Sequence, residues 1–375
     1  MKKILLFAVT LIVFTAIGVP VYAAADADEI YSEQLEASGA DRLNDALPDG
    51  TVEILDKFDI TYDTTDSGLD TDGIFSALIN ALTERINAPL AAAASMLAVI
   101  AISAAVSAAE FQHGRTAAPI NFVTAICLCM ICTVPLCKTV EASAEAVKSC
   151  GVFMLAFVPV YAAVIAASGY TAAAGGFSSL TFGAAEMTVQ LADRLLIPLC
   201  KVLLCCSSVG GVGEVNLNGF VSAAKRTLNW LLGAVMTVFI GVLGLQTSIS
   251  GASDSVGLRT AKFVAGSFVP VIGSAVSESL ATVQGCLSLL KTGIGTYAVA
   301  ALAVIVLPPL IELILWRIAL ELTAGCCDVF DLGREAGMMR SVSAALAIVT
   351  AVLLCCAIMF IVSVAIVSQS ARFVS

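Results

Sequence analysis

Long apolar stretches follow one another along most of this chain, and short polar segments separate them. A helix rises about 1.5 Å per residue, so ~20 apolar residues are needed to cross ~30 Å of hydrocarbon. Several stretches reach that length, which predicts an all-α, polytopic helical membrane protein. The predicted spans are Pro89–Ala109, Ala118–Cys137, Met187–Val209, Leu228–Ile249, Ile294–Trp316 and Ser341–Ser368.

Two further apolar segments, Gly151–Gly169 and Phe263–Ala281, share the tetrapeptide FVPV. The interval between the prolines of the two tetrapeptides equals the interval between two prolines of later spans (270 − 159 = 309 − 198). Each copy also continues with a glycine-rich stretch, a proline-containing span, a basic loop and a terminal apolar span. The pattern predicts a tandem repeat of about 110 residues, with chance similarity between two membrane segments of low complexity as the alternative. Its landmark prolines are Pro159, Pro198, Pro270 and Pro309.

The repeat divides the membrane part of the chain into units. We predict first two membrane spans in 89–138, membrane repeat unit 1 in 139–250 and membrane repeat unit 2 in 251–375. The number of membrane helices is six to eight, depending on whether the FVPV segments cross the membrane or re-enter.

The length of the second FVPV segment favours re-entry. Between Lys262 and Glu278 the apolar piece covers only Phe263–Ser277, which is shorter than the ~20 residues that a span needs. The equivalent loops of the two copies are also both basic, and inverted copies should carry opposite biases. We therefore favour two re-entrant FVPV hairpins, parallel copies and a cytoplasmic Lys225–Arg226 loop.

Residues 1–23 have the organisation of a signal peptide. Lys2 and Lys3 precede an apolar run, and small residues follow Pro20. This pattern predicts a signal peptide, with an uncleaved first span as the alternative. In both cases the next segment emerges on the extracytoplasmic side.

That next segment, 24–88, is acidic and contains apolar residues spaced for short amphipathic helices broken at Pro48. It holds 16 Asp and Glu against three Lys and Arg, a balance of 3 − 16 = −13, whereas the whole chain carries −10. The segment is either a solvated face that stays out of the lipid or a docking element for a protein partner. Its charge argues against attraction to anionic lipid headgroups.

The composition of the chain chiefly serves to exclude classes of protein. The chain is 59% hydrophobic and only 13% charged, which excludes an ordinary soluble domain with ~25% charged residues. No phosphate-binding loop, HExxH or GxSxG pattern is present. The thirteen cysteines are spread around apolar helices, so we expect small buried side chains and no metal site or disulfide. We expect no enzyme, no cofactor and no nucleic-acid partner.

Charged residues inside the apolar stretches remain as functional candidates, because each is costly in lipid unless it faces protein or water. They either pair between helices or line a conduit, and Glu312 is our first choice for a lining residue. The candidates are Asp193, Arg194, Lys201, Glu278, Glu312 and Arg317.

Two stretches also carry a resemblance to a known family. They are YSEQLEASGADRLNDALPDGTVEILDKFDI near the start and, more specifically, RTAKFVAGSFVPVIGSAVSESLATVQGCLSLLKTGIGTYAVA from Arg259 onward. Both resemble the stage III sporulation AE membrane protein family of endospore-forming bacteria. The chain departs from the expected pattern at Ser274 and Ala281, and the family supplies no catalytic residues to carry over.

The resemblance implies a non-enzymatic subunit of a mother-cell sporulation channel complex, an engulfment-stage conduit to the forespore. Its implied partners are other sporulation membrane proteins of the same complex, a forespore-side partner and the lipid bilayer. The implied location is the mother-cell membrane around the forespore, with the N-terminal segment extracytoplasmic. The alternative from the residues is a stand-alone secondary transporter with a repeat-built central site.

Overall fold

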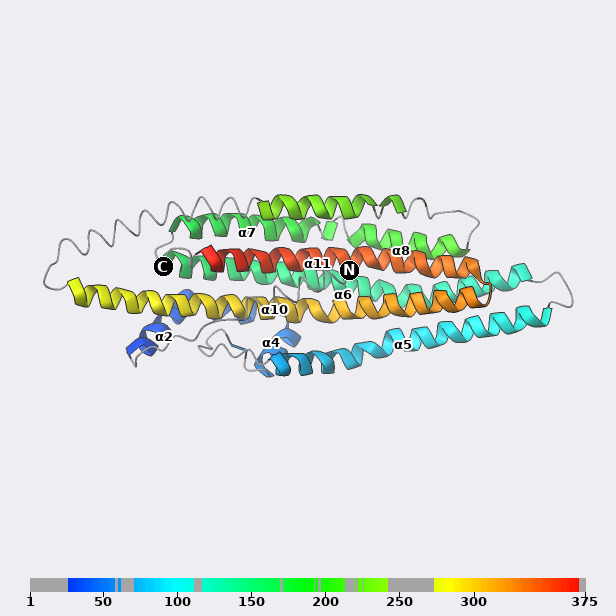
Figure 1. Cartoon of the computed structure of the whole chain (residues 1–375), viewed down its shortest axis with the longest axis horizontal. Coiled ribbons are helices and arrows are strands. Elements are labelled where there is room, and N and C mark those ends of the chain that lie inside the picture. Colours follow the sequence, from blue (N-terminus) through cyan, green and yellow to red (C-terminus); the bar gives the residue numbers. More distant parts are fainter. Residues whose placement is uncertain are drawn as a thin grey trace.

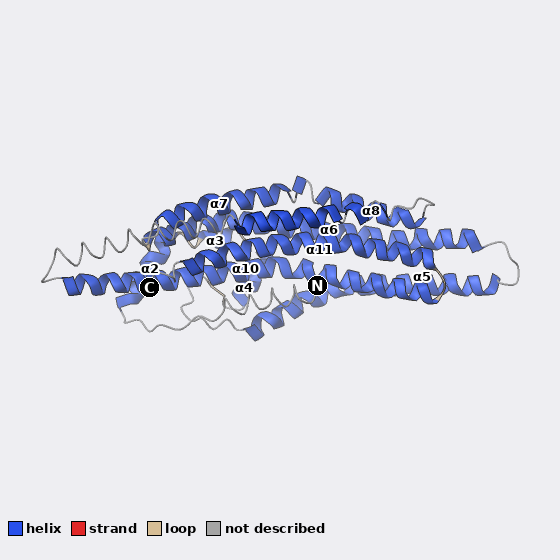
Figure 2. Ribbon diagram, turned by 45° about the horizontal axis from the view of Figure 1, so that its top comes forward, coloured by secondary structure: helices blue, strands red, loops and turns tan. Residues whose placement is uncertain are grey.

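The structure is a computed structural model that describes residues 26–57, 60–61, 71–110, 117–168, 171–191, 193–194, 197–212, 219, 222–224, 226–241 and 273–370. Over these residues every regular element is a helix (Figure 2). The predicted all-α class is therefore confirmed for the described part of the chain. The predicted signal peptide and the second FVPV tetrapeptide lie outside it.

The first part of the acidic N-terminal segment forms three short helices, α2 (Asp26–Ser38), α3 (Arg42–Asp45) and α4 (Asp49–Lys57), and its last residues, 71–88, are the beginning of a long helix. Gly39 directly follows the last residue of α2 and has a φ of +70°. This left-handed conformation is common at the C-terminal end of a helix and favours glycine, which has no Cβ. Leu43 and Leu55 are buried, and α2 and α4 pack against α10. The hydroxyl of Tyr297 on α10 donates a hydrogen bond to Oδ1 of Asn44. The segment thus rests its apolar side on the helical bundle.

The remaining helices lie along the long axis of the molecule (Figure 1). α6 has 51 residues and α10 has 57, so they measure about 77 and about 86 Å at ~1.5 Å per residue. Both are far longer than the ~30 Å hydrocarbon layer. The long elements are α5 (Thr71–Glu110), α6 (Ala117–Ala167), α7 (Thr171–Leu191), α8 (Ile197–Val212), α10 (Gly273–Val329) and α11 (Gly333–Ser370).

Four helices of the described part are long and apolar enough to cross a membrane. α10 packs along α11, α6 and α5, and α6 packs along α7. The predicted class of helical membrane protein agrees with these four helices, while the predicted count of six to eight stays a prediction. The qualifying segments are Ile86–Val106 in α5, Phe122–Ala167 in α6, Gly285–Val329 in α10 and Gly333–Val364 in α11.

One helix joins the predicted span Ala118–Cys137 to the apolar segment that follows it. α6 continues through both without a turn, so the predicted unit boundary at residue 139 falls inside a helix. The reason is local: KTVEASAEAVK, residues 138–148, is polar but contains no glycine or proline. Ala, Glu and Lys are strong helix formers, so polarity alone does not end the helix. The division into repeat units itself stays a prediction.

The predicted span Met187–Val209 is divided between two helices. α7 ends at Leu191 and α8 begins at Ile197, with Pro198 as its second residue. Proline is well accommodated in the first turn of a helix because its missing N–H has no intrahelical acceptor there. The glycine-rich stretch before this span is also helical, as part of α7.

The first FVPV tetrapeptide, Phe157–Val160, lies within α6, and the chain turns back after Ser168 into α7. The two arms, α6 and α7, pack against each other. A Cβ built on Gly151 would overlap Cγ2 of Val189, so glycine permits this close approach. The chain does reverse direction near the predicted hairpin, but its arms are longer than a short re-entrant loop.

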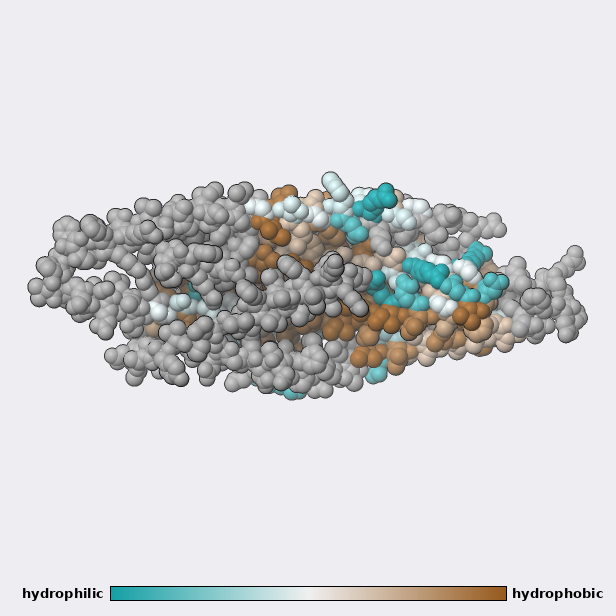
Figure 3. Space-filling model, in the orientation of Figure 1, coloured by the Kyte–Doolittle hydropathy of each residue, from teal (hydrophilic) through white to brown (hydrophobic). Residues whose placement is uncertain are grey.

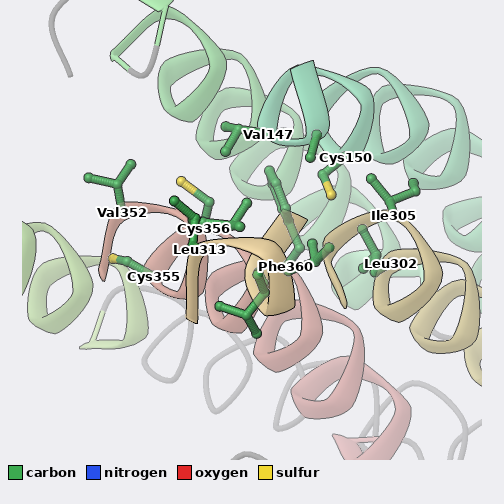
Figure 4. Packing of buried hydrophobic residues seen from close by; sticks show 14 of the residues in the cluster. Val147, Cys150, Leu302, Ile305, Leu313, Val352, Cys355, Cys356 and Phe360 are labelled. Atoms are coloured by element: carbon green, nitrogen blue, oxygen red, sulfur yellow. The ribbon is translucent and has the colours of Figure 1, made fainter. Parts of the chain in front are cut away.

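A continuous apolar core runs through the bundle. Figure 4 shows Val147, Cys150, Leu302, Leu313 and Phe360 from α6, α10 and α11 packed together. The largest side chains of the core, a tryptophan and several phenylalanines, are fully buried as well. The helices are therefore joined chiefly by apolar side-chain packing.

Candidate functional site

The polar block of α6 interrupts an otherwise apolar helix. Lys138, Glu141, Glu145 and Lys148 are all exposed, while Thr139 between them is buried with 1% of its surface accessible. A turn of α-helix takes about 3.6 residues, so neighbouring positions point in different directions. The block therefore presents charges outward and two hydroxyls, those of Thr139 and Ser143, inward.

One of the inward hydroxyls meets a candidate conduit residue. Oγ1 of Thr139 lies 2.6 Å from Oε1 of Glu312 on α10 and donates a hydrogen bond to it. Glu312 is half-buried, and the two residues are 173 positions apart in the sequence. A hydrogen bond to a charged group contributes about 1.5–3 kcal/mol, compared with about 0.5–1.5 kcal/mol for a neutral one. This contact joins the two longest helices at one level of the bundle.

A second polar contact lies two positions further along α6. Nζ of Lys201 on α8 is 2.8 Å from Oε1 of Glu141, with 40% and 60% of the two side chains exposed. Ion pairs this open to water contribute about 0–1 kcal/mol. We call Thr139, Glu141, Lys201 and Glu312 the central polar layer.

The other predicted residues lie outside this layer. Arg317 is half-buried on α10, between the layer and the end of the helix. Asp193 and Arg194 are exposed at the break between α7 and α8. Glu278 lies in the first turns of α10, and its side chain is outside the described part of the structure. The folded chain thus brings two of the six candidates to one layer.

The landmark prolines occupy different settings. Pro159 is exposed within α6 and Pro198 is exposed at the start of α8. Pro309 is buried inside continuous α10, and Pro270 lies outside the described residues. Pro198 and Pro309 would be equivalent in the predicted repeat, yet one starts a helix and the other interrupts a helical hydrogen-bond ladder. The repeat stays a prediction.

Sequence reasoning missed two members of the layer, Thr139 and Glu141. Both lie at the start of predicted repeat unit 1, between two predicted apolar stretches. The signal that could have found them was the mixture of charged and small residues without a helix breaker in 138–148. Such a segment favours a continuing helix with one polar face.

The chemistry of the layer is limited to hydrogen bonding and charge. It contains a hydroxyl, two carboxylates and an ammonium group, and no nucleophile paired with a base. The described residues contain no group of three His, Cys, Asp or Glu side chains able to hold a metal ion. Cys132 packs instead between sulfur atoms, 3.0 Å from Sδ of Met96 and 4.0 Å from Sδ of Met339.

Comparison with known proteins points to one family. Residues 59–371 match the family described as Stage III sporulation protein AE. The stage III sporulation protein AE of Bacillus subtilis (strain 168) is 25% identical over 224 residues, which cover 60% of this chain and 56% of the relative. The chain thus matches little more than half the length of that relative. No solved structure matches.

The matched region includes α5 to α11 and begins after α4, so it contains the whole central polar layer. It covers more than four fifths of the chain (371 − 59 + 1 = 313 of 375 residues). The predicted resemblance is therefore confirmed: the chain belongs to the stage III sporulation protein AE family.

Proposed function

We propose that this protein is a non-enzymatic membrane subunit of a sporulation channel complex, the engulfment-stage conduit between mother cell and forespore. The observation that carries the proposal is the family match over residues 59–371, which contains all four segments suited to crossing a membrane. The mother-cell membrane around the forespore is the proposed location.

The arrangement of the helices favours a role as a scaffold of the complex or as part of the wall of its conduit. Two helices of 51 and 57 residues pack along each other, and a polar contact between Thr139 and Glu312 fixes their register. Long helices with a close-packed apolar core transmit position along the bundle and offer extended surfaces to neighbouring subunits. Other sporulation membrane proteins and a forespore-side partner are the proposed neighbours.

Affinity purification of the tagged full-length chain from sporulating cells tests this proposal. We expect other sporulation membrane proteins to co-elute from gently solubilised membranes and to be absent from vegetative cells expressing the same chain. Recovery of the chain alone, from cells in which it supports sporulation, would contradict the proposal.

A stand-alone secondary transporter is the second candidate, because Glu312 places a carboxylate between two helices of the bundle. Carboxylates in such positions commonly hold protons or cations in transporters. A transporter purified into liposomes moves a solute without partners. A complex subunit is inert under the same conditions.

A further inference from the structure

Two pairs of cysteines from different helices lie near each other, and the proposed function uses neither pair. All thirteen cysteines are free. Cys150 on α6 and Cys356 on α11 lie in the apolar core (Figure 4), with 1% and 5% of their surfaces exposed. Cys137 on α6 is half-buried and Cys205 on α8 is exposed. Of the two pairs, the second is the one that an external reagent can reach.

The directions of the helices place Cys137 and Cys205 at the same level of the bundle. α6 runs from right to left in Figure 1, and α7 and α8 follow one another from left to right. Both α7 and α8 pack against α6, so both are antiparallel to it. On antiparallel helices, a step toward the N-terminus of one helix corresponds to a step toward the C-terminus of the other.

Contacts along α6 fix the register of α7 and α8. Gly151 of α6 lies against Val189 of α7. Further along the bundle, Oε1 of Glu141 on α6 lies 2.8 Å from Nζ of Lys201 on α8. Ten residues back along α6 (151 − 141) thus correspond to twelve residues forward from α7 to α8 (201 − 189). The antiparallel register is therefore nearly kept across the break between α7 and α8.

One helical turn beyond the ion pair, this register brings the two thiols together. Cys137 precedes Glu141 by four residues, and Cys205 follows Lys201 by four residues. Residues four apart lie on the same side of a helix, so the two cysteines share the contact face of the ion pair. Cys137 interacts electrostatically with Cys205 and with both members of the ion pair, which agrees with this placement.

The spacing of packed helices suits a disulfide at facing positions. The axes of two helices in contact are about 8–10 Å apart, and each Cα atom lies about 2.3 Å from its own axis. Cα atoms that face each other are therefore about 3.4–5.4 Å apart. A disulfide requires a Cα separation of about 4.4–6.8 Å. The two ranges overlap, so Cys137 and Cys205 can be joined without moving the helices apart.

Polar surface surrounds this part of α8. Figure 3 shows hydrophilic residues, in teal, on the right half of the molecule, where Figure 1 places α8 and the adjoining parts of α10 and α11. The side chains of Lys201 and Glu141 are also exposed. A water-soluble oxidant can therefore approach the exposed Cys205 thiol first.

We infer that Cys137 and Cys205 form an oxidation site, which a small-molecule disulfide converts into a covalent link between α6 and α8. The Cys205 thiolate attacks the oxidant and releases one of its thiols, and the Cys137 thiolate then attacks the mixed disulfide and releases the second. The two cysteines lose two protons and two electrons, which the oxidant gains as two thiols. The link holds α8, which carries Lys201, in place at the central polar layer. In the reduced protein the polar contact there is an ion pair open to water, which contributes little to stability.

The neighbouring cysteines 205 and 206 provide a matched control, because adjacent residues of a helix point about 100° apart. The purified full-length chain, as wild type, Cys205→Ala or Cys206→Ala, is treated with oxidised glutathione, and the remaining thiols are blocked with N-ethylmaleimide. Tryptic peptides of the monomer are then searched by mass spectrometry for a link between Cys137 and the peptide that contains positions 205 and 206. We expect the link in the wild type and in Cys206→Ala, and a several-fold lower yield in Cys205→Ala. Equal yields in the two variants, no link in the wild type, or an equally abundant link between Cys150 and Cys356 would overturn the inference.

The thermal-unfolding midpoint provides a second measurement. Oxidation should raise the midpoint by several degrees in the wild type and in Cys206→Ala, because a link between residues 68 positions apart (205 − 137) restricts the unfolded chain. Dithiothreitol should reverse the rise, and the midpoint of Cys205→Ala should stay unchanged. An equal rise in Cys205→Ala, or no rise in the wild type, would contradict the proposed link between α6 and α8.

Discussion

Among the individual side chains, the carboxylate of Glu312 and the hydroxyl of Thr139 define the centre of the bundle. A carboxylate at this position is compatible with two roles, lining a conduit and pairing between helices. A substitution that keeps the hydrogen bond but removes the charge distinguishes the two roles. Gln keeps an acceptor oxygen for Thr139 and removes only the charge. The contact itself therefore survives in Glu312→Gln.

We predict that Glu312→Gln leaves protein abundance and assembly unchanged and impairs sporulation after engulfment. Immunoblots of membranes and counts of heat-resistant spores measure the two effects. Loss of the protein itself would instead favour a structural role for the Glu312 charge, because removing one member of an ion pair inside a protein is strongly destabilising.

Thr139→Val provides the complementary substitution. It removes the hydroxyl at almost constant volume and leaves a half-buried carboxylate with one donor fewer, at a cost of about 1–3 kcal/mol. We predict a lower thermal-unfolding midpoint for the purified protein than in Glu312→Gln. An unchanged midpoint would mean that the contact contributes nothing to the packing of α6 on α10.

Between helices, the pair α6–α7 depends on one close approach. A side chain at Gly151 meets Val189, whereas a Cβ at Gly183 on α7 meets nothing within 4 Å. Overpacking costs about 1–3 kcal/mol, while Ala at an exposed helical glycine gains up to ~1 kcal/mol. The two glycines therefore predict effects of opposite sign.

We predict that Gly151→Ala lowers the thermal stability of the purified protein and that Gly183→Ala leaves it unchanged or raises it. Val189→Ala combined with Gly151→Ala should recover part of the loss, because the overlap involves Cγ2 of Val189. If the double variant is no more stable than Gly151→Ala alone, the close packing of α6 on α7 is not the cause.

At the scale of the whole molecule, the acidic segment has an inner apolar face and an outer charged face, and substitutions can change one face without the other. Leu43 and Leu55 are buried against the bundle, while the carboxylates face outward. Deleting Glu29–Asp59 removes both faces at once. Neutralising exposed carboxylates changes the outer face alone.

If the outer face docks a partner, the combined substitutions Glu36→Gln, Asp41→Asn and Asp45→Asn should abolish spore formation without loss of the protein from the membrane. Deletion of Glu29–Asp59 should do the same while leaving membrane insertion intact. Leu43→Ala serves as the contrasting variant. It leaves a cavity that lowers the free energy of unfolding by about 2–5 kcal/mol, and it keeps every charge. Normal sporulation by the neutralised strain would end the docking hypothesis.

The order of residues was sufficient to predict several features of this protein. Apolar runs of membrane length predicted helices that suit a bilayer, because lipid requires every backbone polar group to be paired within its own segment. The acidic segment was predicted to form short helices broken at Pro48, since its apolar residues recur at helical spacing. The family followed from the stretch beginning at Arg259, and the match over residues 59–371 confirms it.

Which residues meet became known only from the folded chain. Helices that are apolar on nearly all sides carry no periodic signal for the face that packs inward. The rotation and register of α6, α8 and α10 therefore could not be predicted, and neither could the contacts of Glu312 with Thr139 and of Lys201 with Glu141. The same holds for the close approach of α6 and α7 at Gly151. Such contacts depend on packing between segments far apart in the chain, which local sequence does not encode.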